Sequence, residues 1–248
     1  MNQHCKNCGH TFPGNFCSHC GQSANTHRLN LHSIWMDIRY GIFHFNDKIF
    51  FTAKQLVYRP GYAIHDYLEG KRLKYFQPIS FVIILATFYG LLGHAFHLHI
   101  VIDNGDVDPV FAKLGLEKIN DWIINHYSWI ALLSVPLFTI STYLAFKKHG
   151  YNFVEHLAIN SFLTAQRFLF LIVCFPIIHW LNDSPYFTLY TRINLFLEFL
   201  LMYWGFSQLF PQLPKTKILK LLIFAAMILF ALILVVSVII AWFLEYFV

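Results

Sequence analysis

The chain has 248 residues, of which 57% are hydrophobic, 19% aromatic and only 12% charged. An ordinary soluble domain carries about 25% charged residues, so this composition excludes the soluble globular class and indicates a membrane protein. The net charge of +5 is spread over separate short segments. No compact basic fold accompanies it, and no nucleic-acid partner is expected.

The N-terminus contains two Cys-x-x-Cys pairs within the stretch "CKNCGHTFPGNFCSHC", and a glycine directly follows each pair. The cysteines are Cys5, Cys8, Cys17 and Cys20. Zinc prefers four tetrahedral ligands, and thiolates suit it. We therefore predict a zinc-ribbon-like β hairpin over residues 1–24 that binds one structural zinc ion. An iron centre with four sulfur ligands stays open as an alternative.

Two other roles for these cysteines are less favoured. Disulfides are disfavoured by the cytoplasmic location predicted below, and a redox Cys-x-x-Cys motif usually belongs to a larger βαβ fold, which is absent. A closed shell of four thiolates also leaves no open metal position for catalysis.

Residues 25–78 form the second predicted region, an amphipathic and interfacial helical segment. Apolar residues recur at near-helical spacing over residues 29–58, which is typical of a helix in the bilayer interface or packed on the protein itself. A Pro-Gly turn at residues 60–61 precedes a short helix that Gly70 ends. The candidates for contact with lipid headgroups are Arg59, Lys71, Arg72 and Lys74. Their plainer role is membrane anchoring and topology.

Membrane-spanning helices are expected in the rest of the chain, because a span needs about 20 mostly apolar residues. The predicted transmembrane bundle covers residues 79–248, with spans at about 79–100, 127–146, 154–181, 188–210 and 218–247. Lysine and arginine gather before the first span and after the second and fourth. By the positive-inside rule the N-terminus is cytoplasmic and the C-terminus lies outside.

These features together resemble the bacterial membrane family catalogued as domain of unknown function 3667. The matching motifs are the cysteine knuckles, the pattern "RPG…Y…G.R..Y..P" and "FVEHLA" near residues 153–158. The matching residues outside the cysteines are Pro60, Gly61, Tyr67, Gly70, Arg72, Tyr75 and Pro78. The resemblance implies this architecture and a bacterial inner membrane, but it brings no known activity.

Polar residues inside the predicted spans are candidates for function, because charges at membrane depth are costly. His156, Asn160, Thr164 and Arg167 share one helical face of the third span. Counting from the helix ends puts Arg167 and Glu198 at similar depth, so we predict an ion pair between them. The pair either holds two spans together or takes part in moving a proton, ion or substrate.

The sequence thus predicts an all-α integral membrane protein with about five transmembrane helices and a small zinc hairpin. The leading functional hypothesis is a non-enzymatic scaffold or adaptor whose hairpin docks a cytoplasmic protein partner, with lipids as the other partner. A transporter or channel that uses Arg167 and Glu198 is the second. A lipid-directed membrane enzyme is the third, with Glu155 and His156 as its candidate catalytic residues. The oligomeric state is not indicated.

Overall fold

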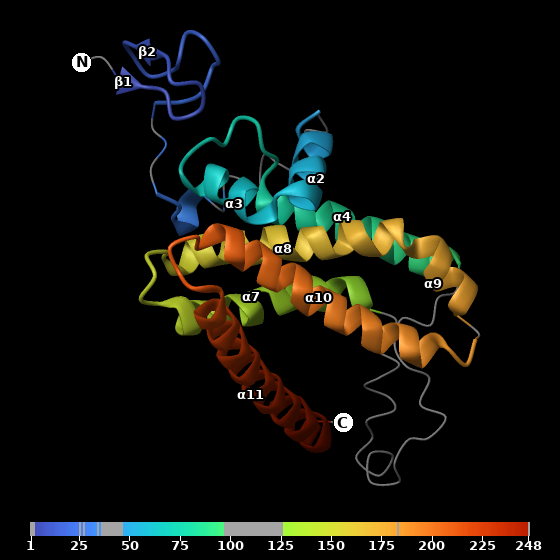
Figure 1. Cartoon of the computed structure of the whole chain (residues 1–248). Helices are drawn as coiled ribbons and strands as arrows, with labels where there is room; N and C mark the ends of the chain where they lie inside the picture. Colours follow the sequence, from blue (N-terminus) through green and yellow to red (C-terminus); the bar gives the residue numbers. More distant parts are fainter. Residues whose placement is uncertain are drawn as a thin grey trace.

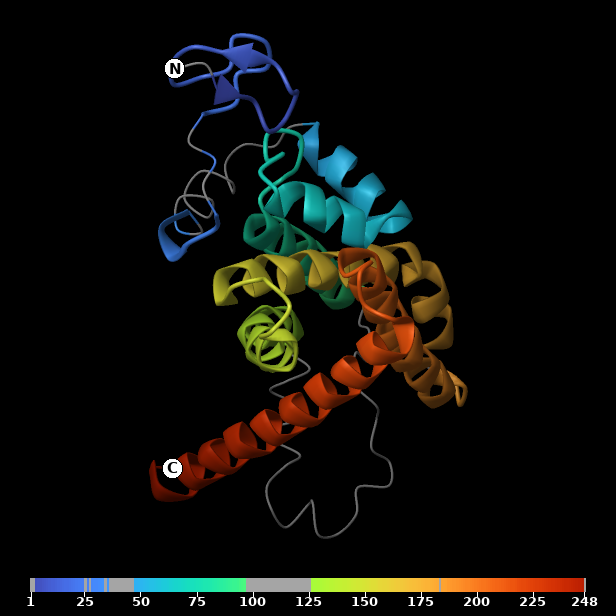
Figure 2. The same ribbon diagram turned by 60° about the vertical axis from the view of Figure 1, so that its left-hand side comes forward.

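A computed structural model describes residues 3–24, 26, 28–33, 35, 47–96, 126–182 and 184–247. In these residues the protein consists of a small β hairpin and a mostly helical bundle. The two views agree that the hairpin lies outside the bundle, beyond one end of its central helices (Figures 1 and 2). The predicted combination of a helical bundle and an N-terminal hairpin is therefore confirmed in outline.

The hairpin pairs two short antiparallel strands, β1 (Gln3–His4) and β2 (Thr11–Phe12). Gln3 lies opposite Phe12, and His4 lies opposite Thr11. Its small core consists of Cys5, Phe12 and Cys17, each with 5% or less of its surface exposed. Three buried side chains of this kind are too few to stabilise a domain of this size. The cysteines must therefore contribute most of its stability.

Two short helices follow, α2 (Lys48–Tyr58) and α3 (Pro60–Leu68). The chain leaves helical geometry only at Arg59 (φ −152°, ψ 61°), and Pro60 then begins α3, where its missing N–H group costs nothing. The turn predicted at residues 60–61 therefore lies one residue earlier, and Pro60 and Gly61 are the first residues of α3. Of the helix predicted over residues 29–58, the part at 36–46 lies outside the described residues.

The bundle is centred on α8 (Phe153–Val173), which packs against α4 (Pro78–Ala95) and α7 (Tyr127–Phe146). Figure 1 shows α4 and α8 side by side, and α10 (Phe187–Leu209) contacts α8 and α3. Large aromatic side chains fill the contact, as with Tyr89 of α4 and Phe168 of α8, whose ring centroids are 5.8 Å apart. Packing of these rings contributes to the contact between the two helices.

The last helix, α11 (Lys215–Phe247), leaves the bundle at a steep angle (Figure 2). One stripe of its described side chains is buried, at Ile218, Leu222 and Ala225, and it faces helices α7 and α10. The remaining surface exposes many large apolar side chains between Leu219 and Trp242. A helix that is apolar on all sides suits a lipid environment.

Within the described residues, four helices are long and apolar enough to cross a membrane: Pro78–Ala95, Trp129–Phe146, Phe153–Val173 and Lys215–Ile239. They correspond to the first, second, third and fifth predicted spans. Helix α10, the fourth predicted span, has 23 residues but is not among them. Its polar positions, such as Arg192, Asn194 and Glu198, lower its hydropathy.

The third predicted span, at residues 154–181, differs from the structure because it is not one helix. Helix α8 ends at Val173, and the separate helix α9 (Phe175–Leu181) follows. Pro176 lies in the first turn of α9. Since proline has no N–H group and its ring clashes with the carbonyl of the residue four places earlier, it ends the preceding helix.

Basic residues gather at one end of the bundle. Helices α4, α8 and α11 begin at the end where α7 and α10 finish, which is the end nearest the hairpin (Figure 1). The loops and first turns there contain Lys71, Arg72, Lys74, Lys147, Lys148, Lys215, Lys217 and Lys220. The structure therefore brings the basic segments of the sequence to the same side of the bundle.

Candidate functional site

The four hairpin cysteines form a compact cluster. Their sulfur atoms all lie within 4.8 Å of one another, with Cys5 Sγ 3.5 Å from Cys20 Sγ and Cys8 Sγ 3.6 Å from Cys17 Sγ. Four thiolates at 2.3 Å from a tetrahedral metal ion would be about 3.8 Å apart. The cluster therefore fits one metal ion with four sulfur ligands. It is the only group of this kind among the described residues.

Two matching backbone turns hold the cysteines. Gly9 N donates to Cys5 O and Gly21 N donates to Cys17 O, each at 2.8 Å. Both glycines adopt the left-handed conformation, with φ of 75° and 77°, which a residue with a side chain rarely adopts. The glycine after each Cys-x-x-Cys pair is therefore required by the turn.

The thiols of the cluster compete for protons. The backbone N–H group of Gln22 is the main cause that lowers the pKa of Cys20 to about 6. The backbone of His10 lowers the pKa of Cys8, but burial and the neighbouring sulfurs outweigh it and raise this pKa to about 12. A bound divalent cation would stabilise all four thiolates together, which is why such clusters release protons when they bind metal.

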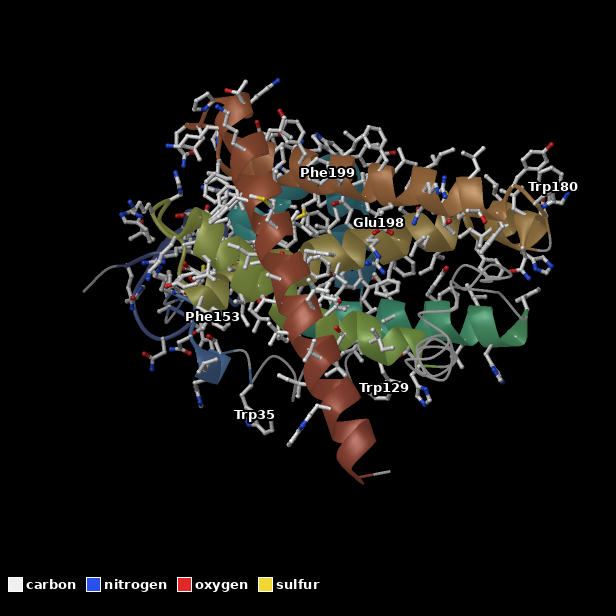
Figure 3. All side chains as sticks on the ribbon, turned by 90° about the horizontal axis from the view of Figure 1, so that it is seen from below. Trp35, Trp129, Phe153, Trp180, Glu198 and Phe199 are labelled. Carbon is white, nitrogen blue, oxygen red and sulfur yellow. The ribbon has the colours of Figure 1, made fainter. Side chains whose placement is uncertain are left out.

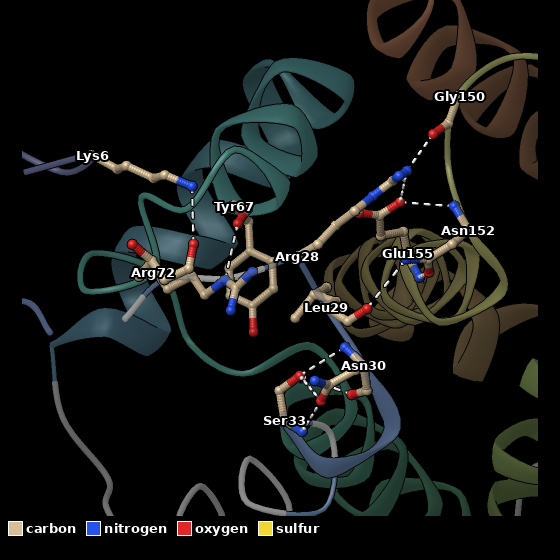
Figure 4. Close-up of polar contacts among 11 residues, drawn as sticks. Lys6, Arg28, Leu29, Asn30, Ser33, Tyr67, Arg72, Gly150, Asn152 and Glu155 are labelled. Atoms are coloured by element: carbon tan, nitrogen blue, oxygen red, sulfur yellow. Dashed lines mark hydrogen bonds and ion pairs between the residues drawn. The ribbon is translucent and has the colours of Figure 1, made fainter. Parts of the chain in front are cut away.

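A short strap, defined here as residues 26 and 28–30, joins the hairpin to the bundle (Figure 4). At its start, Lys6 Nζ of the first cysteine turn donates to Thr26 O at 2.9 Å. Further along, Arg28 forms a bidentate ion pair with Glu155, from Nε to Oε1 at 2.7 Å and from Nη2 to Oε2 at 2.8 Å. Arg28 Nη2 also donates to Gly150 O. Sequence reasoning missed this pair.

Glu155 also belongs to the capping box of α8, whose N-cap residue is Asn152. Asn152 N donates to Glu155 Oε2 at 2.7 Å, and Glu155 N donates to Asn152 Oδ1 at 2.8 Å, which is a capping box. Asn152 Nδ2 reaches back to the strap and donates to Leu29 O at 3.2 Å. Leu29 itself is buried. The carboxylate predicted as a catalytic candidate is therefore 3% exposed and fully engaged in holding structure.

His156 is completely buried between α7 and α8. Its Nδ1 lies 3.3 Å from Thr142 Oγ1, and Asn160 Nδ2 donates to the same oxygen at 2.7 Å. Asn160 Nδ2 also donates to His156 O at 2.8 Å. This polar layer joins the two helices, and Thr142 is a member that sequence reasoning did not find. No side chain in it reaches the surface.

A polar cavity of about 440 Å³ lies beside the Arg28–Glu155 pair. It is lined by the hairpin, the strap, the end of α3, and the loops after α7 and α10. Burial, and then the charges of Glu69 and Glu155, raise the pKa of Tyr151 on the cavity wall to about 12.

Two of the four predicted headgroup residues pair with Asp66 on α3. Lys71 Nζ lies 2.6 Å from Asp66 Oδ1, and Arg59 Nη2 lies 3.2 Å from Asp66 Oδ2. Arg72 covers the ring of Tyr67 at 5.7 Å and donates to Tyr67 O at 3.5 Å. Lys74 is exposed. The structure thus brings Arg59 and Lys71 together, and a role in binding headgroups stays a prediction.

Arg167 and Glu198 meet within the bundle. Arg167 Nε lies 3.4 Å from Glu198 Oε1, and both side chains are 21% exposed. Asn194 Nδ2 donates to the same carboxylate oxygen at 2.9 Å. Figure 3 shows Glu198 on the side of α10 that faces α8. The guanidinium of Arg167 also lies 5.6 Å from the centre of the Phe168 ring. Whether this group holds the helices or has a further role stays a prediction.

Comparison with known proteins finds a family match for one segment of the chain. Residues 47–90 match the family described as "Protein of unknown function (DUF3667)". The DUF3667 match confirms the resemblance found in the sequence, and it covers α2, α3 and most of α4. It includes the helix junction at Arg59, the Asp66 cluster and Gly70, but neither the cysteines nor α8. No curated protein and no solved structure matches the chain.

Proposed function

We propose that this chain is a membrane adaptor whose metal hairpin docks a protein partner at the cytoplasmic surface. The observation that carries the proposal is the position of the hairpin, outside the bundle but fixed to it by the Arg28–Glu155 pair (Figures 1 and 4). A module held in this way presents a surface in a defined orientation. Phe16 on that surface is 67% exposed, which is typical of an anchor residue in a protein interface.

The membrane arrangement in this proposal has five spans. Helix α10 is the added span, and its Arg167–Glu198 contact with α8 lowers the cost of its charged position. The basic residues at the hairpin end support a cytoplasmic N-terminus by the positive-inside rule. The family resemblance supports a bacterial inner membrane. For the metal we propose zinc, because four thiolates are its common structural ligand set.

A pull-down of the full chain from membranes tests the docking role. Phe16→Ser removes the exposed ring but keeps every cysteine, and Asn15→Ala changes an exposed neighbour as the control. We expect Phe16→Ser and Cys5→Ser/Cys8→Ser to lose the same partner proteins, and Asn15→Ala to keep them. If all variants capture the same partners at equal expression, the docking role is rejected.

A transporter or channel is the second proposal, supported by the polar group of Arg167, Asn194 and Glu198 inside the bundle. Flux measurements on the protein in liposomes would test it, with Glu198→Gln as the variant expected to change transport. An enzyme that uses Glu155 and His156 has less support, because Glu155 is engaged by Arg28 and by the capping box of α8, and His156 is buried.

A further inference from the structure

A continuous set of contacts connects the cysteine cluster to the central helix of the bundle. Lys6 lies between two metal-ligand positions, Cys5 and Cys8, and its ammonium group donates to Thr26 O of the strap. The stem of Lys6 also lies against Gly70, where an added Cβ would be 2.8 Å from Lys6 Cδ. The position of Lys6 thus depends on the turn that the cysteines close.

The strap continues these contacts to α8. Two residues after Thr26, Arg28 forms its ion pair with Glu155, and the next carbonyl, Leu29 O, accepts from Asn152. Glu155 and Asn152 are the two members of the capping box. Any movement of the strap therefore acts directly on the groups that satisfy the first turn of α8 (Figure 4).

The hairpin depends on its metal for order. Cys5, Phe12 and Cys17 are its only buried hydrophobic residues among those described, so without the ion little would hold the cysteine turns. Loss of the ion would free Lys6, and the strap would lose its anchor on that side. The capping box of α8 would then be weakened, because Glu155 would lose the restraint that the strap places on it.

We propose that the cysteine cluster is a sensory site for a thiophilic divalent cation, and that its occupancy is transmitted through Lys6 and the strap to the N-terminus of α8. Because α8 packs against both α4 and α7, a change at its first turn reaches the centre of the bundle. This inference requires metal in the hairpin but no partner protein. It can therefore fail or hold independently of the docking role.

Hydrogen exchange of the full chain in detergent, followed by mass spectrometry, tests the proposal. The zinc-loaded protein is compared with protein stripped by a chelator. We expect the amides of residues 150–156 to exchange about tenfold faster after metal removal. Amides in the second half of α8 should be unchanged. If chelation exposes residues 5–22 while residues 150–156 keep their exchange rates, the proposed coupling is overturned.

Lys6→Ala separates coupling from metal binding. It leaves all four cysteines in place, so the variant should still bind one zinc ion. Its amides at 150–156 should exchange at the faster rate whether or not zinc is bound. Lys54→Ala, which removes an exposed lysine of α2, is the matched control and should respond as the unchanged protein does. A Lys6→Ala protein that still responds to chelation would disprove this route.

Discussion

Gly61 on α3 lies directly against the backbone of Gly205 on α10. A Cβ added at Gly61 would be 2.2 Å from Gly205 O and 2.6 Å from Leu209 N. The close approach also lets Gly61 N donate to Gln208 Oε1 at 3.0 Å. Two helices far apart in the sequence therefore meet backbone to backbone, and α3 alone of the two lies in the segment that matches the DUF3667 family.

Gly61→Ala is expected to destabilise the protein by about 2 kcal/mol or more, because the new methyl group meets rigid backbone. Gly205→Ala is the comparison. Its Cβ would meet only Leu163 Cδ2, at 2.6 Å, which is the flexible end of a side chain. Thermal unfolding of the purified proteins should show a clearly larger drop in Tm for Gly61→Ala. Equal drops would mean that the α3–α10 contact is looser than described.

The Arg28–Glu155 pair should contribute about 1–2 kcal/mol to stability, less than a fully buried pair because the Arg28 side chain is 61% exposed. The matching substitutions are Arg28→Ala and Glu155→Gln, since glutamine can still cap α8. A double-mutant cycle on unfolding free energies measures the coupling directly. A coupling energy near zero would remove the strap from the account of how the hairpin is held.

The cysteine cluster should bind one metal ion per chain. Cys8→Ser is expected to lose the ion, and Cys174→Ser, which changes the cysteine outside the hairpin, is expected to keep it. Elemental analysis of the purified proteins gives both the stoichiometry and the identity of the metal. Acid should release the ion, because its ligands must be deprotonated thiolates. Retention of metal by Cys8→Ser would contradict four-sulfur ligation.

Asp66 should make stability depend on pH. Burial acts to raise its pKa, but the hydrogen bond and charge of Lys71, with smaller contributions from Tyr75 and Arg59, lower it below the ordinary value of 3.8. Because its pKa is lowered, the ionised carboxylate stabilises the fold at every pH above the ordinary pKa of the group. This contribution is lost as the pH falls through the folded-state pKa.

Unfolding of the unchanged protein and of Asp66→Asn should therefore differ at pH 7 and converge as the pH falls below about 4. The two curves are recorded by the same thermal melt across the pH series. A difference that persists unchanged at the lowest pH would show that the Asp66 charge is not its source.

Arg167 and Glu198 can be tested by exchanging their charges. Arg167→Glu or Glu198→Arg alone places two like charges together inside the bundle, and each variant should accumulate poorly in membranes. The double exchange restores opposite charges and should recover much of the lost expression. Asn194 complicates the exchange only slightly, because its amide can also accept a hydrogen bond from arginine. A double variant no better than the singles would reject the pairing.

Much of the fold can be predicted from local sequence patterns. The two cysteine turns close within a few residues, so their spacing was enough to predict the cluster. The second span was predicted at 127–146, and α7 has the same limits. Pro176, by contrast, is a local signal that the third predicted span divides into two helices.

The contacts between distant segments could not be predicted in the same way. Arg28 and Glu155 are separated by 127 residues, and nothing in either local sequence specifies the other. Asn152 three residues before Glu155 is a capping-box pattern, however. Recognising it would have assigned Glu155 to the start of a helix and not to acid–base chemistry. Thr142 became part of the His156 layer only through the packing of α7 on α8.

Helix α11 has one more consequence. Its 33 residues extend about 50 Å at 1.5 Å per residue, whereas the hydrocarbon core of a bilayer is about 30 Å thick. A membrane accommodates such excess length by tilt of the helix, by a kink or by local thickening of the bilayer, and any tilt increases as the bilayer becomes thinner. Since its first turns are packed against α7 and α10, a change in tilt would exert a force on these two helices. Bilayer thickness would then be a mechanical input to the same end of the protein that bears the cysteine hairpin.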